Sequence, residues 1–242
     1  MSVKLKELLI QDLAEELETA EKISIEEIAS EIRNIGFSCN MCGKCCRKEH
    51  GDNTVVVSPE EIESICNNNR LEHSRVAMPF TTDVPGILPD ERYLEDNRDL
   101  IDTDGNIHTF GWKLLRKRNG DCSFIPDKVA GNRCGIYDVR PMLCSTYPFY
   151  MESGKLKTSE CEGLGQQIPH EDSLKLAAEV IFRYIAEIEE TIRLYKIYEG
   201  FEQGTENLNK ALDNIREGII NYIVHDSKGS HRTELKNEHI ID

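Results

Sequence analysis

The sequence contains no long apolar run. No stretch of its 242 residues approaches the roughly 20 consecutive apolar residues that span a bilayer. The opening segment, MSVKLKELLIQDLAEELETAEK, lacks the apolar core and small-residue cleavage site of a secretory signal, because acidic residues interrupt it from Glu7 onward. We therefore expect a cytoplasmic protein with no membrane partner, in a compartment where thiols stay reduced and structural disulfides are rare.

Positive charge is also scarce. Lys and Arg total 29 against 44 Asp and Glu, which gives a formal net charge of -15. Such a chain repels phosphate backbones unless a local basic patch overrides the global field. The local basic group beside Trp112, formed by Lys113, Arg116, Lys117 and Arg118, is more typical of a basic turn between strands. We therefore expect no nucleic-acid partner.

Several catalytic signatures are missing as well. The sequence has no Gly-rich phosphate loop, no paired-His metal motif, and no Ser or Cys nucleophile with an evident base. Ordinary hydrolysis is therefore disfavoured, and whether the chain is an enzyme stays open.

What the sequence does have is cysteine. Residues 39–46, CNMCGKCC, place four thiols within eight residues, in a chain with nine cysteines. A Cys-x-x-Cys turn lets two thiolates converge on one ion, and Gly43 can adopt the positive φ that such a turn often needs. The successive spacings of Cys39, Cys42 and Cys45 match a ferredoxin loop that holds three irons of one cubane cluster. Cys144 is a natural fourth ligand from farther along the chain.

Eight of the nine cysteines are predicted metal ligands: Cys39, Cys42, Cys45, Cys46, Cys122, Cys134, Cys144 and Cys161. The ninth, Cys66, shares a predicted helix face with Ile62 and Ile65 and is interpreted as a small core residue. Eight sulfurs can form two zinc sites, a zinc site and an iron–sulfur cluster, two clusters, or one site with further thiols around it. Zinc and an iron–sulfur cluster, most simply 4Fe-4S, both accept four thiolates, so spacing does not decide between them.

Two expectations concern the end of the cysteine run. Adjacent side chains diverge in most backbone conformations, so Cys45 and Cys46 are expected to serve two different sites. His50 could substitute as a ligand, but we interpret it as a solvated surface histidine.

Periodicity predicts helices at both ends of the chain. Apolar residues at helical spacing indicate two helices within residues 1–36, the second starting at a capping box of Ser24 and Glu27. Two more apolar stripes, Leu174 to Tyr195 and Leu208 to Tyr222, predict a C-terminal helical hairpin in residues 170–226. Its apolar seam could dock a protein partner. Residues 227–242 are predicted to be a flexible tail.

The middle of the chain, residues 37–169, carries all eight candidate ligands. It contains a short β-branched strand at Thr54 to Val57, a helix capped by Ser58, and a long loop over residues 67–106. An Asn-Gly turn predicts a hairpin that carries Cys122 on its second strand. The fold class is therefore α+β: a small metal-nucleated cysteine-cluster domain with short strands, flanked by the N-terminal helices and the C-terminal hairpin.

Four blocks of sequence resemble a known family. FSCNMCGKCC, GDCSF, RCGIYDVRPMLCSTYPF and CEGLG occur in the same order as in the YkgJ-type cysteine-cluster family, a zinc- or iron-chelating domain with a CxxCxxCC signature. The resemblance spans roughly Phe37 to Gly165. It implies metal chelation through the cysteines, and it extends distantly to flagellin lysine N-methylases.

Two residues of the third block are predicted to support a bound metal. Arg140 can offset part of the net charge of about -2 on a divalent ion or cubane with four thiolates. Tyr147 can exclude water beside Cys144. We expect metal or iron–sulfur binding with redox or electron-transfer use. The alternatives are a cluster-dependent protein lysine methyltransferase and a zinc-stabilised interaction module.

Overall fold

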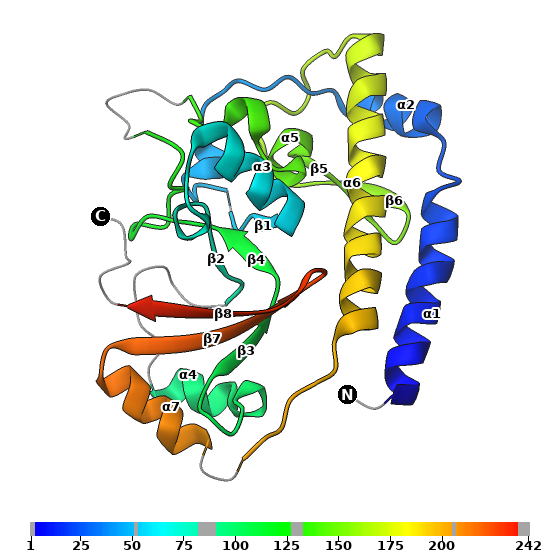
Figure 1. The fold of residues 1–242 in the computed structure, drawn as a ribbon. Coiled ribbons are helices and arrows are strands. Elements are labelled where there is room, and N and C mark those ends of the chain that lie inside the picture. Colours follow the sequence, from blue (N-terminus) through cyan, green and yellow to red (C-terminus); the bar gives the residue numbers. More distant parts are fainter. Residues whose placement is uncertain (1–2, 51–52, 82–90, 127–132, 205–206, 237–242) are drawn as a thin grey trace. The chain divides into compact units, whose positions relative to one another are not determined.

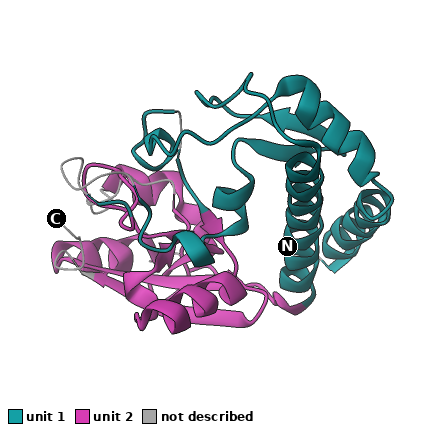
Figure 2. Cartoon of the chain, turned by 90° about the horizontal axis from the view of Figure 1, so that it is seen from above, with its two compact units in different colours: residues 1–55, 125–196 teal, residues 56–124, 197–242 magenta. Residues whose placement is uncertain are grey.

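The chain forms two compact units, each built from two separate segments (Figure 2). Unit 1 comprises residues 1–55 and 125–196, and unit 2 comprises residues 56–124 and 197–242. The computed structural model describes residues 3–50, 53–81, 91–126, 133–204 and 207–236. Helices and short strands occur in both units, which confirms the α+β class.

Unit 1 is built mainly from three helices and one β-hairpin (Figure 1). Its elements are α1 (Val3–Ala20), α2 (Ile25–Ile35), the single-turn helix η1 (Lys44–Cys46), η5 (Tyr137–Val139), α5 (Met142–Thr146), β5 (Phe149–Glu152), β6 (Lys155–Thr158) and α6 (His170–Ile197). The predicted N-terminal helices are confirmed. The Ser24 hydroxyl caps α2 by accepting a hydrogen bond from the backbone N–H of Glu27 at 3.3 Å.

The core of unit 1 lies between these helices and the hairpin. Residues three or four apart on α6, including Val180, Tyr184 and Ile188, pack with α1, α2 and β5. Phe149 of β5 is 1% exposed, and its ring meets that of Phe37 edge to face at 5.5 Å. This core therefore includes the side chain of Phe37, two residues before the cysteine run.

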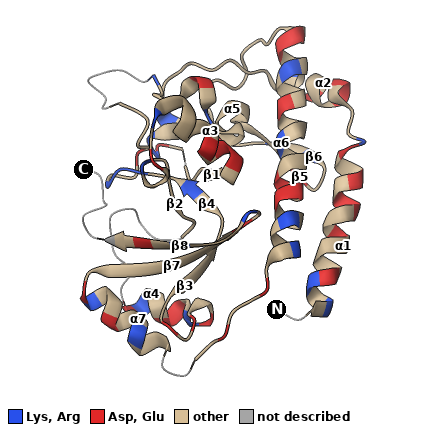
Figure 3. Ribbon diagram, in the orientation of Figure 1, with Lys and Arg blue, Asp and Glu red and all other residues tan. Residues whose placement is uncertain are grey.

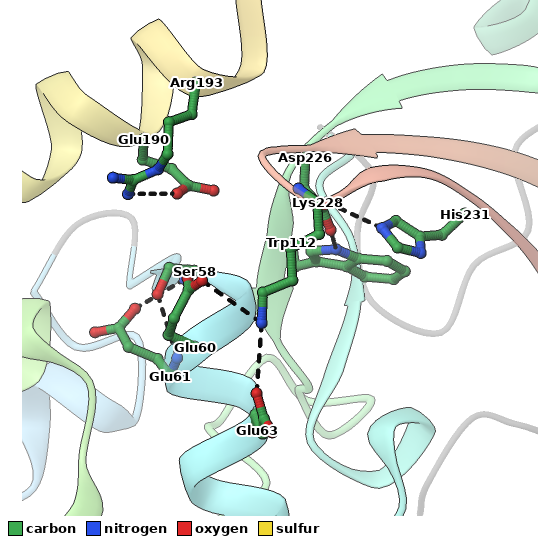
Figure 4. A network of polar contacts seen from close by, with 10 residues as sticks. All are labelled: Ser58, Glu60, Glu61, Glu63, Trp112, Glu190, Arg193, Asp226, Lys228 and His231. Carbon is green, nitrogen blue, oxygen red and sulfur yellow. Dashed lines mark hydrogen bonds and ion pairs between the residues drawn. The ribbon is translucent and has the colours of Figure 1, made fainter. Parts of the chain in front are cut away.

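Helix α6 also carries charged residues along its length (Figure 3). Arg183 bonds Glu187 at 2.7 Å, and Arg193 lies 3.1 Å from Glu190, a pair drawn in Figure 4. Opposite charges three or four residues apart stabilise a helix. The apolar residues of α6 pack in the core of unit 1, and a protein partner stays a prediction. Within the described ranges, no helix is long and apolar enough to cross a membrane.

Unit 2 contains two three-stranded sheets and short helices. Its elements are β1 (Val56–Val57), α3 (Pro59–Asn69), η2 (His73–Arg75), β2 (Ala77–Pro79), α4 (Glu91–Asp96), η3 (Arg98–Leu100), β3 (Ile107–Phe110), β4 (Trp112–Leu114), α7 (Asn207–Arg216), β7 (Ile219–Asp226) and β8 (Gly229–Lys236). One sheet has the order β1-β4-β2 and is antiparallel. In the other, β7 pairs in parallel with β3 and antiparallel with β8.

Helix α3 anchors the β7–β8 turn (Figure 4). The predicted capping box is confirmed: the backbone N–H of Ser58 bonds Glu61, and Ser58 accepts from the backbone of Glu61 at 3.2 Å. Lys228, in the turn, lies 3.5 Å from Glu60 and 3.4 Å from Glu63. One turn residue thereby bridges two carboxylates of α3.

The predicted C-terminal helical hairpin is wrong after Arg216. Helix α7 ends there, Gly218 takes a φ of 78°, and β7 begins at the next residue. The apolar residues at the end of the predicted helical stripe form a strand instead. In this strand every second residue, Ile220, Tyr222 and Val224, points into the core. Strand β8 then occupies half of the predicted flexible tail, and residues 237–242 lie outside the described part.

The predicted long loop and hairpin also differ from the structure. Residues 67–106 include η2, β2, α4 and η3, while residues 82–90 lie outside the described part. Before the Asn-Gly turn, where the first strand of the hairpin was expected, Gly111 with a φ of 83° separates β3 from β4, which belong to different sheets. Cys122 forms an isolated bridge with Arg116 rather than a second strand. Lys113, counted in the basic group, is buried and donates to Thr81.

A hydrogen-bonded chain of side chains crosses the β3-β7-β8 sheet. His108 Nε2 lies 3.1 Å from Asp102, His108 Nδ1 lies 2.7 Å from His225 Nε2, and His225 Nδ1 lies 2.8 Å from Ser230 Oγ. Both histidines are 4% exposed. If Asp102 accepts, each neutral ring must donate toward Asp102 and accept from the other side, so Ser230 donates to His225. A single arrangement of protons therefore satisfies all three of these hydrogen bonds.

Acidification is expected to destabilise unit 2. Burial, then the nearby His108, lower the pKa of His225 from 6.5 to about 4 against the opposing effect of Asp226, and burial lowers the pKa of His108 against the effect of Asp102. The unfolded chain therefore binds more protons than the folded one, and stability is lost as the pH falls below 6.5. For His225 alone the loss is at most about 3 kcal/mol.

Trp112 can report this loss, because it is the single tryptophan, is 4% exposed and donates to Asp226 at 2.8 Å. Urea unfolding followed by its fluorescence should give a falling free energy of unfolding between about pH 7 and pH 4. His225→Asn should reduce that slope. An equal slope in both proteins would contradict the account.

Candidate metal centre

The segment entering the cysteine run is paired with the segment that follows the last cysteine. Phe37 and Leu164 form an antiparallel bridge, the Ser38 N–H donates to the Gly163 carbonyl at 3.0 Å, and the Gly165 N–H donates to the Gly36 carbonyl at 3.0 Å. The structure thus brings the neighbourhoods of Cys39 and Cys161 side by side, although they are far apart in sequence.

The run itself turns at Gly43. This residue has a φ of 75° and a ψ of 6°, a left-handed conformation that suits glycine, and it precedes the single turn of η1. The N–H of Cys46 donates to the Gly43 carbonyl at 3.1 Å. The predicted role of Gly43 in curling the backbone is confirmed.

The side chains of Cys45 and Cys46 were expected to diverge, but they lie close together. Their Sγ atoms lie 3.9 Å apart. The hydrogen bond from Cys46 is the main reason why the pKa of the Cys45 thiol falls to about 7, against the opposing effect of burial. The single-turn helix explains this, because it rotates consecutive side chains less far apart than an extended backbone does. The argument for two sites based on divergence therefore fails.

Cys161 lies near the thiols of the run. Burial is the main cause that raises its pKa, and the thiolates of Cys39, Cys45 and Cys42 raise it further, while the Gly163 N–H opposes them. An ion pair between Lys44 and Glu162 joins the same two segments. Sequence reasoning missed this pair, although each partner directly neighbours a candidate ligand.

Cys134 and Arg140 come from a third segment of unit 1 that lies near the cysteine run. Burial raises the pKa of the Cys134 thiol, a hydrogen bond from the Ile136 backbone and the Arg140 charge lower it, and the Cys45 thiolate raises it. The Arg140 guanidinium lies 3.9 Å from the centre of the Tyr137 ring and donates to the Tyr137 carbonyl at 3.2 Å. Arg140 thus places a positive charge near Cys134, and its role beside a bound metal stays a prediction.

Cys144 and Tyr147 come from the short helix α5 and its end. The Cys144 N–H donates to the Pro141 carbonyl at 2.9 Å, and a cis peptide joins Tyr147 to Pro148. The Tyr147 hydroxyl donates to the Glu160 carbonyl. Burial, then the thiolates of Cys45 and Cys161, raise the pKa of Tyr147 to about 12, so the phenol stays protonated beside the thiols.

The remaining two cysteines belong to unit 2. Cys122 lies in the loop after β4, and its relation to the other candidate ligands stays a prediction. Cys66 lies on α3, and burial raises the pKa of its thiol, which fits the interpretation as a packed thiol.

All nine cysteines are free thiols, as a metal site requires. Within the described ranges, no three His, Cys, Asp or Glu side chains are arranged around a common ion position. The donor chemistry still fits zinc or iron, since seven free cysteines gather in unit 1 with Lys44 and Arg140 beside them. A further sign is His50, whose side chain is 16% exposed and whose Nε2 is buried without a partner in the described part of the chain.

Comparison with known proteins agrees with this chemistry. The family model named CxxCxxCC, described as "Putative zinc- or iron-chelating domain", matches residues 38–162, just over half of the chain. No curated protein and no solved structure matches the chain. The distant similarity to flagellin lysine N-methylases therefore stays a prediction. The matched region begins one residue before the first candidate cysteine and ends one residue after the last. The chain belongs to the CxxCxxCC family of zinc- or iron-chelating domains.

Proposed function

We propose that unit 1 chelates a single zinc or iron ion and that Cys45 and Cys46 both bind it. The observation that carries this proposal is the distance of 3.9 Å between their Sγ atoms. Metal–sulfur bonds of about 2.3 Å at tetrahedral angles place two sulfurs about 3.8 Å apart. In a cubane cluster each cysteine binds a different iron, so its thiolates need not approach so closely.

The remaining donors come from the other thiols near this pair, and Cys42, Cys134 and Cys161 are the candidates. Cys161 and Cys134 both respond to the charge of Cys45, and they come from two other segments of unit 1. Lys44 and Arg140 place positive charge beside the thiolates, which offsets part of the net negative charge that several thiolates leave on a divalent ion. Bound iron would supply one-electron redox chemistry, and electron transfer is the use that we propose for it.

A 4Fe-4S cluster is the second candidate, and a separate observation favours it. Cys39, Cys42 and Cys45 all raise the pKa of Cys161, so the three thiols at ferredoxin spacing lie near a fourth. The sequence had pointed to Cys144 for that position. In this arrangement Cys46 is a neighbour of the cluster rather than a ligand.

An absorption spectrum of anaerobically purified protein separates these forms. A single thiolate-bound iron and a cubane both absorb visible light and respond to dithionite, and only the cubane contains acid-labile sulfide. Zinc gives no visible absorption. We expect zinc or iron without sulfide. A colourless zinc protein would refute the electron-transfer use and favour the zinc-stabilised interaction module. Stoichiometric sulfide would refute the single-ion centre.

A further inference from the structure

His50 is placed unlike a surface histidine. The sequence suggested a solvated ring, but the side chain is 16% exposed and Nε2 is buried. No described residue lies within hydrogen-bonding distance of that nitrogen in a suitable direction. A buried polar atom without a partner destabilises a fold, so such an atom in a native protein usually meets a water, an ion or another bound group.

The ring also stands where two cysteine segments meet. His50 follows Cys46 by four residues, and its Nδ1 lies 3.9 Å from the carboxylate of Glu160, the residue just before Cys161. Histidines that bind metals commonly direct one ring nitrogen toward a carboxylate, which leaves the other nitrogen for the ion. In His50 the nitrogen nearer the carboxylate is Nδ1, so the buried Nε2 is the nitrogen that could bind an ion.

We propose that His50 Nε2 is a ligand of the metal ion, which makes the centre a mixed site of three thiolates and one imidazole. This inference rests on the proposed function and specifies its donor set. Zinc accepts such a Cys3His set as readily as four cysteines. A neutral imidazole in place of one thiolate reduces the net charge on a divalent ion from about -2 to about -1. That suits a site partly withdrawn from water.

Cobalt binding to the full chain tests the donor set. Co²⁺ with three thiolates and one imidazole gives a thiolate-to-cobalt charge-transfer band that grows when a fourth thiolate is added. We expect His50→Ala to lower the affinity for Co²⁺ and Zn²⁺ by at least about tenfold. His50→Cys should restore binding and strengthen the band. His170→Ala, which removes an exposed histidine of unit 1, is the matched control and should bind like the wild type.

The outcomes separate the two proposals. If His50→Ala keeps the wild-type affinity and spectrum, or if His50→Cys leaves the band unchanged, His50 is no ligand and Nε2 meets an ordered water. The thiolate band would then persist, and the proposed function would stand. If the wild type gives no thiolate band at all, both proposals fail. Circular dichroism checks that His50→Ala folds, and where it does not, the His50→Cys spectrum decides.

Discussion

Cys42→Ser is expected to release the metal. The thiol of Cys42 directly precedes the Gly43 turn and acts electrostatically on Cys161, Tyr147 and Lys44, so it lies near the other thiols of unit 1. A serine hydroxyl stays protonated at neutral pH and is a poor ligand for zinc or iron where a thiolate is preferred. We expect the affinity to fall by about 100-fold or more, beyond the loss typical of residues that only support a ligand.

Cys66→Ser is the matched control for this loss. Cys66 lies on α3 in unit 2, and burial raises the pKa of its thiol, which disfavours the thiolate that metals bind. Its replacement should leave the ratio of metal to protein unchanged when both variants are purified anaerobically and analysed for metal. Equal losses in the two variants would show that the assignment of ligand and packed cysteine is wrong.

Gly163→Ala is expected to separate the two cysteine segments. A Cβ at this position would overlap the Ser38 carbonyl oxygen and lie 3.1 Å from its carbon and 3.2 Å from the Phe37 ring. Because backbone atoms cannot move aside as a flexible side chain does, the pairing that includes the 3.0 Å Ser38–Gly163 hydrogen bond must shift. Overpacking of this kind costs about 1–3 kcal/mol, and the displaced thiols should bind metal at least about tenfold more weakly.

Gly154→Ala provides the comparison. Gly154 lies in the β5–β6 turn of unit 1 with a φ of 72°, and an added Cβ would meet no atom within 4 Å. Alanine in this left-handed conformation should cost about 1–2 kcal/mol without moving a cysteine. Urea unfolding and Zn²⁺ titration of both variants separate the two effects. If Gly154→Ala weakens zinc binding as much as Gly163→Ala does, general destabilisation explains the loss and the paired segments do not position the thiols.

Local chemistry in the sequence predicted the features that depend on neighbouring residues. Ser24 and Ser58 cap helices because their hydroxyls reach backbone N–H groups three residues on, and Gly43 adopts the positive φ that its turn needs. The α+β class followed from the same local patterns. None of these requires knowledge of distant contacts.

Features that depend on distant partners were not predictable in this way. The apolar spacing from Leu208 to Tyr222 fits a helix. The residues after Gly218 nevertheless form strand β7, because they pair with β3 and β8. The burial of His50 and the position of Cys161 beside the run arise from contacts across more than 100 residues of sequence. The closeness of Cys45 and Cys46 depends on the single turn of η1, a conformation that the spacing does not specify.

The central claim is that cysteine thiolates of unit 1 hold a zinc or iron ion, and X-ray absorption at the edge of the bound metal tests it most directly. The account predicts a first shell dominated by sulfur at about 2.3 Å, with a lighter scatterer at about 2.0–2.1 Å from the His50 imidazole. Cys42→Ser should abolish the sulfur shell, and Cys66→Ser should leave it unchanged. A shell of oxygen and nitrogen without sulfur in the wild-type protein would contradict the account.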